Sequence, residues 1–308
     1  MVYNNILEAV GNTPMIKLAN MVDDDSAQII VKFEGLNVGG SIKTRTAINM
    51  IKDAEDKGLI NKDTIIVEPT SGNQGIGLAL VGAVKGYKTV IIMPDSVSEE
   101  RRKLVNHYGA EVVLIHDAGN IGECIEMCLE TALKMQREDE NVFVPQQFIN
   151  PANPSIQRSQ TGMEIIKQVD GPIHGFCSGI GTGGTITGIG ETLKEYNPDI
   201  TIWAVEPKHA AILSGGSIGT HLQMGIGDGI IPDILNQNIY SDICIIEDDE
   251  AIQTAKDLAS KEGIMCGISS GTNVAAAIKL AKKLGKGKTV VTVLPDTAER
   301  YFSTPLFQ

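Results

Sequence analysis

The chain has 308 residues, 42% of them hydrophobic and 21% charged, a balance typical of a soluble protein with an ample core. Its formal net charge of −12 argues against nucleic acid or an anionic membrane as the main partner, because both require a basic surface. No apolar run approaches the ~18 residues of a membrane span, and residues 1–10 lack the basic start of a secretory signal, so we expect a cytoplasmic protein.

Short β-rich segments alternate with amphipathic segments along almost the whole chain. The predicted strands are mostly continuously apolar, as in parallel strands covered on both faces, and span residues 28–34, 64–67, 88–93, 111–115, 173–177, 201–205 and 289–294. The predicted helices span residues 44–57, 98–108, 121–137, 249–261 and 273–284. This alternation predicts an α/β fold with twisted, mainly parallel sheets and helices on both faces.

Smaller features complete this outline. The Pro-rich segment 148–154 (FINPANP) is the clearest break in composition, and we expect the chain to cross there between two domains with a site in their cleft. Cys124 and Cys128 lie one turn apart on a predicted helix, where we expect reduced thiols that pack rather than bind metal. Arg101 and Arg102 are expected on a solvated helix face, and Trp203 in the core.

Four turns combine glycine with small hydroxyl or amide residues. They are residues 39–43 (GGSIK), 70–75 (TSGNQG), 179–185 (GIGTGGT) and 267–271 (GISSG). TSGNQG and GIGTGGT each follow a predicted strand and lead into helical sequence. Ligands of α/β sheets bind outside the carboxyl ends of strands, so the backbone N–H groups of these turns would converge on an anion.

The GIGTGGT turn alone leaves several ligands open. Its glycines fit G-x-G-x-x-G, and Glu206 ends the next strand about 20 residues on, as an NAD site requires. Thr182 and Thr185 instead supply hydroxyls suited to a terminal phosphate monoester. A dinucleotide, a simple phosphate and a structural turn all remain possible from this motif.

The GISSG turn matches the G-x-S-x-G elbow of α/β hydrolases, in which the catalytic histidine follows the serine. All five histidines precede Ser269, so the order excludes that class. Lys43 follows the GGSI turn and shares the chain with a phosphate-type loop, Asn73 and Ser269. A Schiff-base lysine, a phosphate cradle and partners for a ring together predict a pyridoxal-phosphate site.

Longer motifs extend this pattern from residues 6–17 (ILEAVGNTPMIK) to 299–301 (ERY). Between these ends occur GGSIKTR, TSGNQGIGLA, MPDSVSEERRKL, QQFINPANP, GTGGTITG, GIGDGIIP, GISSG and LPDTAERY. Through them the sequence resembles the cysteine synthase family, which includes O-acetylserine sulfhydrylases and the catalytic core of cystathionine β-synthases. The resemblance implies a two-domain fold-type II (tryptophan synthase β-like) enzyme, usually a homodimer. The implied domains are residues 1–11 with 36–147 (smaller) and 12–35 with 148–308 (larger), with the cofactor in their cleft.

The resemblance also implies residue roles. Lys43 would hold pyridoxal 5′-phosphate as a Schiff base and later remove the Cα proton, Asn73 would contact the ring hydroxyl, and Ser269 the pyridine nitrogen. The phosphate would be bound by Gly181, Thr182, Gly183, Gly184 and Thr185. The substrate carboxylate would be bound by Thr70, Ser71, Gln74 and Gln147. No metal is expected.

Three positions depart from the common sulfhydrylase pattern: Thr44 replaces aspartate, Gln74 replaces threonine, and Asp228 replaces a small apolar residue. Asp228 either points away or pairs with a cation, or it acts as a base. Sulfide is largely HS⁻ at neutral pH and needs no base, and a carboxylate would repel it, whereas water needs a positioned base. We therefore expect Asp228 to activate water or another protic nucleophile.

These observations predict a lyase or transferase of cysteine metabolism that eliminates or replaces a β-substituent through α-aminoacrylate. We place the conversion of L-cysteine and water to L-serine and H₂S first, O-acetylserine sulfhydrylase (cysteine synthase) second, and cystathionine or lanthionine synthesis third. An NAD-dependent oxidoreductase is the alternative of another class. Some family members bind the C-terminal tail of serine acetyltransferase in the cleft, but Gln74 and Asp228 argue against that partner here.

Overall fold

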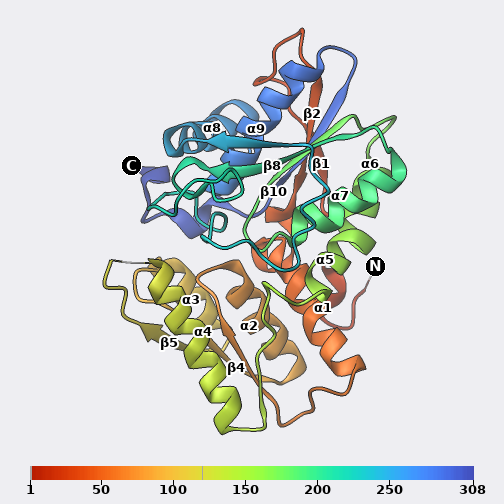
Figure 1. Ribbon diagram of the computed structural model, residues 1–308. Helices are drawn as coiled ribbons and strands as arrows, with labels where there is room; N and C mark the ends of the chain where they lie inside the picture. The colour runs from red at the N-terminus through yellow and green to blue at the C-terminus, as the bar shows by residue number, and fades with distance from the viewer. Residues whose placement is uncertain (1, 120) are drawn as a thin grey trace.

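The computed structural model describes residues 2–119 and 121–308, which form two lobes, each built around a twisted sheet (Figure 1). The six-stranded lobe contains, in spatial order, β1 (Met15–Lys17), β2 (Gln28–Phe33), β10 (Thr289–Leu294), β7 (Gly175–Gly179), β8 (Thr201–Pro207) and β9 (Asp242–Ile246). The four-stranded lobe contains β5 (Glu111–Ile115), β4 (Lys88–Pro94), β3 (Ile65–Pro69) and β6 (Val142–Phe143). In the described chain every neighbouring pair is parallel except β1 with β2, which confirms the predicted sheet type.

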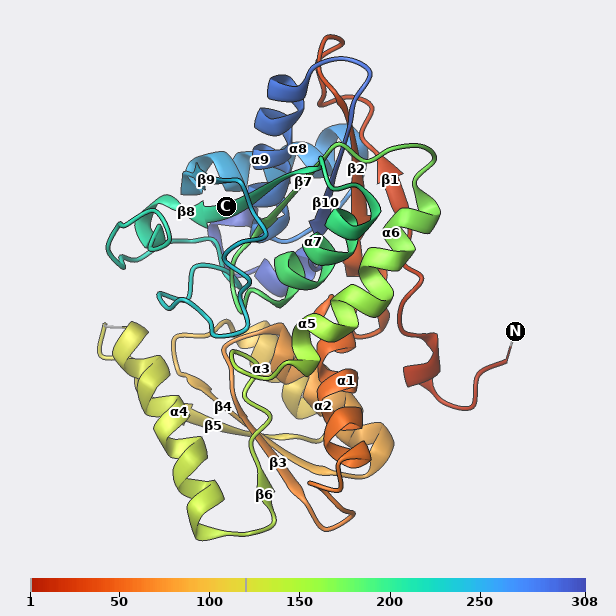
Figure 2. The same cartoon turned by 45° about the vertical axis from the view of Figure 1, so that its right-hand side comes forward.

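Helices cover both faces of each sheet, as Figure 2 shows for α4 and α2 of the four-stranded lobe. That lobe carries α1 (Lys43–Asp56), α2 (Asn73–Lys85), α3 (Glu99–His107) and α4 (Ile121–Glu138). The other lobe carries α6 (Met163–Gln168), α7 (Gly184–Tyr196), α8 (Asp248–Glu262) and α9 (Ile268–Leu284). The short α5 (Ala152–Ile156) packs against both α1 and α7 and so lies where the lobes join. None of the helices in the described ranges is long and apolar enough to cross a membrane.

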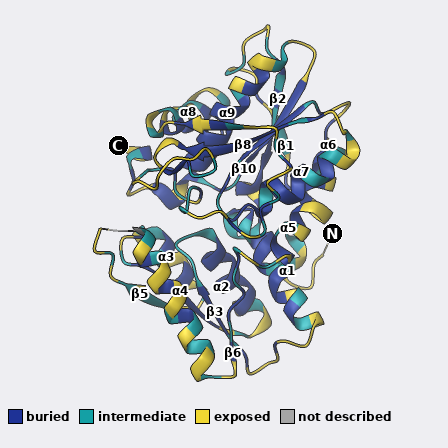
Figure 3. Cartoon of the chain, viewed as in Figure 1, coloured by how far each residue is buried: buried dark blue, intermediate teal, exposed yellow. Residues whose placement is uncertain are grey.

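The core explains why the strands are apolar without alternation. Along β10, Val290 and Leu294 pack with α8 and α9, whereas Val291 and Val293 pack with α6 and α7 on the opposite face. A strand buried on both faces needs apolar side chains at every position. Figure 3 accordingly shows the strands mostly as buried, with exposed residues concentrated on helix surfaces and loops.

The seven predicted strands correspond to β2, β3, β4, β5, β7, β8 and β10, each within two residues of its predicted limits. β1, β6 and β9 were not predicted, because they are too short or too irregular in pattern to be recognised locally. The predicted start of α9 is five residues late, because the glycines of GISSG suggest a loop. Gly271 is required inside this helix because a Cβ there would lie 2.0 Å from the Ala251 carbonyl oxygen of α8.

Candidate active site

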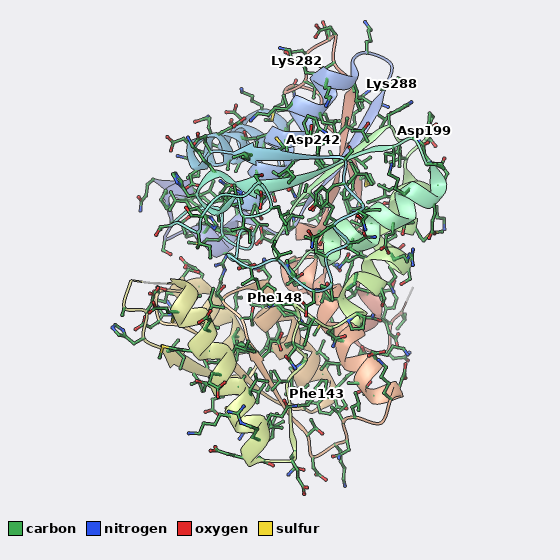
Figure 4. The ribbon with its side chains drawn as sticks, in the orientation of Figure 1. Phe143, Phe148, Asp199, Asp242, Lys282 and Lys288 are labelled. Atoms are coloured by element: carbon green, nitrogen blue, oxygen red, sulfur yellow. The ribbon has the colours of Figure 1, made fainter. Side chains whose placement is uncertain are left out.

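A cavity of ≈ 260 Å³ lies between the lobes, at the carboxyl ends of β3 and β7. Figure 4 shows Phe148, which lines the cavity, at the level where the two lobes meet. Of the residues that the family resemblance assigns to the site, the structure brings together Lys43, Thr70, Ser71, Asn73, Gln74, Gln147, Gly181, Thr182, Gly183, Thr185, Asp228 and Ser269. Gly184, the first residue of α7, is the exception, since it is not among the residues that line the cavity.

Lys43 is the first residue of α1 and is half-buried at the cavity. Burial lowers the pKa of its amine, and the negative charges of Asp228 and Asp296 oppose this shift. The preceding turn is held from the other lobe by Arg300, which donates from Nη1 to the Gly40 carbonyl oxygen at 2.7 Å. Gly40 has a φ of 69°, and a Cβ there would collide with that guanidinium, so glycine is needed to support the lysine.

The GIGTGGT turn crosses from β7 into α7 beneath the cavity. Gly183 is left-handed (φ 78°), and the Thr182 hydroxyl accepts a 2.9 Å hydrogen bond from Asn153 Nδ2. A Cβ on Gly181 would lie 2.6 Å from the Gly225 carbonyl oxygen, so the two loops approach as closely as glycine allows. The start of α7 leaves backbone N–H groups without helical partners, which suits a phosphate.

Two amides in the TSGNQG turn leave polar atoms for a ligand. Asn73 Oδ1 and Gln74 Oε1 are buried and have no hydrogen-bond partner among the described residues. Buried acceptors without partners are costly, so a ligand that donates hydrogen bonds would stabilise this turn. Together with Ser269 in the first turn of α9, these groups fit a flat, polar cofactor ring beside Lys43.

Asp228 lines the cavity rather than pointing away. Burial raises the pKa of its carboxyl group, and the positive charges of Lys43 and His221 oppose this shift. No hydrogen bond or ion pair in the described parts of the chain involves the Asp228 side chain. His221 supports the loop, because its Nε2 lies 3.0 Å from the Gly227 carbonyl oxygen while its Nδ1 accepts from the Gln223 backbone N–H at 3.1 Å. The carboxylate is therefore held at the site and remains available to a substrate.

Two carboxylates were not predicted from the sequence: Glu68, which lines the cavity, and Asp296, which bonds to the cavity residue Asn73. Glu68 is the second-last residue of β3, just before TSGNQG, and its two oxygens accept hydrogen bonds from the backbone N–H groups of Gln146 (2.8 Å) and Gln147 (2.9 Å). Asp296 follows β10 within LPDTAERY and bonds to Asn73. Both could have been found from the sequence, because each acidic residue lies at the C-terminal end of an apolar strand, which is where α/β sheets bind ligands.

The structure also shows the surroundings of several other residues about which the sequence allowed a prediction. Arg101 is not on a solvated face: it is 5% exposed, with its guanidinium 5.0 Å from the centroid of the Tyr301 ring. It is buried because α3 packs against the ERY segment of the other lobe. Glu206 does not face a ribose site, since its carboxylate accepts hydrogen bonds from Leu213 and Ser214. Trp203 and both cysteines of α4 are buried as predicted.

A half-buried lysine between two lobes, a glycine-rich turn at a helix start and unpaired amide groups around them define a pyridoxal-phosphate enzyme. A family profile with the description "Pyridoxal-phosphate dependent enzyme" matches residues 6–296. The chain therefore belongs to this family, and pyridoxal 5′-phosphate is its cofactor.

Relatives narrow the family further. Proteins named cysteine synthase from the Mu50 and N315 strains of Staphylococcus aureus are each 48% identical over 305 residues, covering 99% of this chain and 97% of theirs. A solved hydrogen sulfide-producing enzyme from Fusobacterium nucleatum is 41% identical with a TM-score of 0.92, covering 97% of this chain and 100% of that one. An O-acetylserine dependent cystathionine beta-synthase from Helicobacter pylori is 34% identical with a TM-score of 0.93, covering 100% of both. The chain is thus a pyridoxal-phosphate-dependent enzyme of the cysteine synthase family, as the motifs predicted.

Proposed function

We propose that this enzyme makes L-cysteine from O-acetylserine and sulfide. The observation that supports this reaction best is the 48% identity, over nearly the full chain, to proteins named cysteine synthase. That similarity favours the reaction over the conversion of L-cysteine to L-serine, which sequence analysis placed first. Both reactions would use the same cofactor site and the same first half, in which the β-substituent leaves.

The chain's own groups would act in that first half. When bound, pyridoxal phosphate withdraws electrons from the substrate Cα, so that the Cα proton and the β-substituent can leave. Lys43 Nζ would take up the Cα proton, and burial lowers the pKa of this amine, which favours its neutral, proton-accepting form. Thr182 and Thr185, with the start of α7, would hold the phosphate, while Ser269 would contact the pyridine nitrogen.

The TSGNQG turn and Gln147 would hold the substrate carboxylate. Thr70, Ser71 and Gln147 line the same cavity as Lys43 and come from segments that end at the carboxyl edge of the four-stranded sheet. Gln147 is 5% exposed, and Glu68 fixes its backbone. A carboxylate bound between this turn and Gln147 would place the substrate Cα toward Lys43.

A second candidate is the reaction of L-cysteine with water to give L-serine and H₂S. The specific observation that favours it is Asp228, a carboxylate at the cavity that accepts no hydrogen bond from a described residue. Water needs such a base, whereas HS⁻ would be repelled by it. The similarity to the Fusobacterium nucleatum hydrogen sulfide-producing enzyme points in the same direction.

One pair of incubations separates these reactions. Cofactor-loaded enzyme is given L-cysteine alone, or O-acetylserine with sulfide, and sulfide, serine, cysteine, pyruvate and lanthionine are quantified. Cysteine formation at a kcat/KM far above that of sulfide release supports the first proposal. Equal amounts of sulfide and serine from cysteine, at the higher kcat/KM, would replace it with the second, and lanthionine would mean that a second cysteine attacks.

Asp228→Asn tests the carboxylate itself. If Asp228 activates water, we expect serine formation from cysteine to fall by at least ~100-fold, while cysteine synthesis from sulfide is kept or rises because the repelling charge is lost. The absorbance of the bound cofactor on adding cysteine should then change and persist. Undiminished serine formation in Asp228→Asn would rule out a base at this position.

We further propose that the enzyme is a cytoplasmic homodimer, that its two domains have the limits given above, and that it does not bind the serine acetyltransferase tail. Gln74 and Asp228 support the last point, because both alter the part of the cleft in which that tail would lie. Gel filtration of the enzyme with and without a peptide of that tail would test the dimer and the absence of binding.

A further inference from the structure

Asp296 is a fully buried carboxylate with one hydrogen-bonded oxygen and one oxygen that has no partner among the described residues. Its Oδ2 accepts hydrogen bonds from Asn73 Nδ2 at 2.6 Å and from the Tyr301 hydroxyl at 2.7 Å. Its Oδ1 is buried without a partner among the described residues. A Cβ on Gly267 would lie 2.1 Å from this oxygen. The carboxylate therefore fits only because residue 267 is glycine.

The backbone places this carboxylate beside the lysine. Asp296 follows β10 and pairs with Ser41 in an isolated bridge, and the Ile42 N–H donates to the Pro295 carbonyl oxygen at 2.9 Å. The segment that bears Asp296 thus runs alongside the segment that ends in Lys43. The negative charge of Asp296 opposes the lowering of the Lys43 pKa by burial.

The hydrogen bond between Asp296 and Asn73 joins the two lobes and fixes the orientation of the Asn73 amide. Asn73 begins α2 of the four-stranded lobe, whereas Asp296 belongs to the six-stranded lobe. An ionised carboxylate only accepts hydrogen bonds, so the NH₂ end of the Asn73 amide must face Asp296. Its Oδ1 then faces elsewhere and has no described partner. Tyr301 donates to the same carboxylate oxygen as Asn73, and Arg101 packs on the Tyr301 ring.

We propose that Asp296 is a positioning residue of the cofactor site, which sets the orientation of the Asn73 amide and stabilises positive charge on the Lys43 nitrogen. Its role rests on the proposed attachment of the cofactor to Lys43 and is independent of the nucleophile. Asp296 touches the cofactor's partners rather than the reacting atoms. The lysine–cofactor nitrogen should therefore hold its proton to a higher pH because Asp296 is present.

The test is a pH titration of the visible absorbance of the loaded enzyme, with no substrate. In Asp296→Asn and Asp296→Ser, we expect the pH at which the chromophore loses its proton to fall by about one unit or more, since both remove a nearby charge. Cofactor affinity, measured by dialysis and reloading, should weaken by about tenfold, as expected for one lost charge-assisted hydrogen bond. Tyr301→Phe is the matched control, because it removes a hydrogen bond to the same oxygen and keeps the charge, so its titration should stay near that of the wild type.

Two outcomes would overturn the inference. In the first, the Asp296→Asn or Asp296→Ser variant binds the cofactor and titrates like the wild type. In the second, the Tyr301→Phe variant shows as large a fall in the titration pH as the Asp296 variants do. Asp296→Ser, being smaller than the native residue, guards against a packing failure in Asp296→Asn. Borohydride reduction followed by peptide mass spectrometry locates the cofactor separately. Attachment at a residue other than Lys43 would disprove the lysine assignment, and with it the inference.

Discussion

Glu68 illustrates how a single side chain at this site can make the protein sensitive to pH. Its carboxyl is fully buried, and burial raises its pKa to about 7 although two backbone N–H groups oppose the shift. Those donors belong to Gln146 and Gln147, and Gln146 has a left-handed φ of 57°, which is unusual for a residue other than glycine. Glu68 therefore fixes a strained turn in the cavity wall.

The raised pKa predicts the sign of a pH effect on stability. The folded protein holds the Glu68 proton more tightly than the unfolded chain does, so this contribution is present below the unfolded pKa of 4.5 and is lost as the pH rises through about 7. We expect it to amount to about 3 kcal/mol, and Glu68→Gln to abolish it. Urea unfolding from pH 5 to 8 measures this as the difference between wild type and variant. A difference that does not change with pH would contradict the prediction.

At the level of elements, the close contact of α8 with α9 positions Ser269. The first turn of α9 carries Ser269 into the cavity, and Gly271 lets α8 approach the same turn. Helix propensity favours alanine over glycine by about 1 kcal/mol, so glycine is retained here for packing. The two helices and β10 belong to one core cluster, which ties the cofactor wall to the interior of the six-stranded lobe.

Gly271→Ala should therefore destabilise the protein despite its better helix propensity. A Cβ 2.0 Å from the Ala251 oxygen forces α8 and α9 apart, and we expect a loss of about 2–3 kcal/mol and weaker cofactor binding. Ala259→Gly on the exposed face of α8 is the control, with an expected cost of about 1 kcal/mol from propensity alone. Thermal unfolding of both variants compares the two effects. A Gly271→Ala protein as stable as the wild type would show that the helices can separate freely.

At the scale of the whole molecule, a buried ion network joins the lobes beside the site. Arg45 of α1 bonds through Nε to Glu34 at 2.8 Å and through Nη1 to Glu164 at 2.7 Å, and Lys32 lies 2.7 Å from Glu164. Burial alone would raise the pKa of Glu164, but Arg45 and Lys32 lower it to about 2. The contribution of Glu164 to stability is therefore present above its unfolded pKa of 4.5 and is lost as the pH falls through about 2.

Arg45→Met should weaken this junction strongly. It leaves the fully buried Glu34 without its cation, and removing one partner of a buried pair typically costs about 3–5 kcal/mol. Lys52→Met, on the same helix but in an exposed pair with Asp56, should change stability by less than about 0.5 kcal/mol. Urea unfolding of both variants measures the contrast. Equal costs for the two substitutions would mean that the network adds nothing to the junction.

The fold class, the cofactor chemistry and twelve of the cavity-lining residues could be predicted from the sequence. Continuous apolar strands, helical periodicity and the glycine-rich turns are local patterns, and local sequence encodes them directly. Twelve of the residues assigned through those motifs meet at one cavity, because the carboxyl ends of parallel strands lie on the same edge of a sheet.

Which groups touch could not be predicted locally, because it depends on tertiary packing. Asn73 and Asp296 are 223 positions apart, Glu68 and Gln147 are 79 apart, and nothing local in either segment indicates its partner. The burial of Arg101 and the approach of Asp228 to Lys43 depend in the same way on how one lobe packs on the other. Such contacts arise from the packing of whole elements, and a carboxylate acquires its role only from the charges and donors that packing brings beside it.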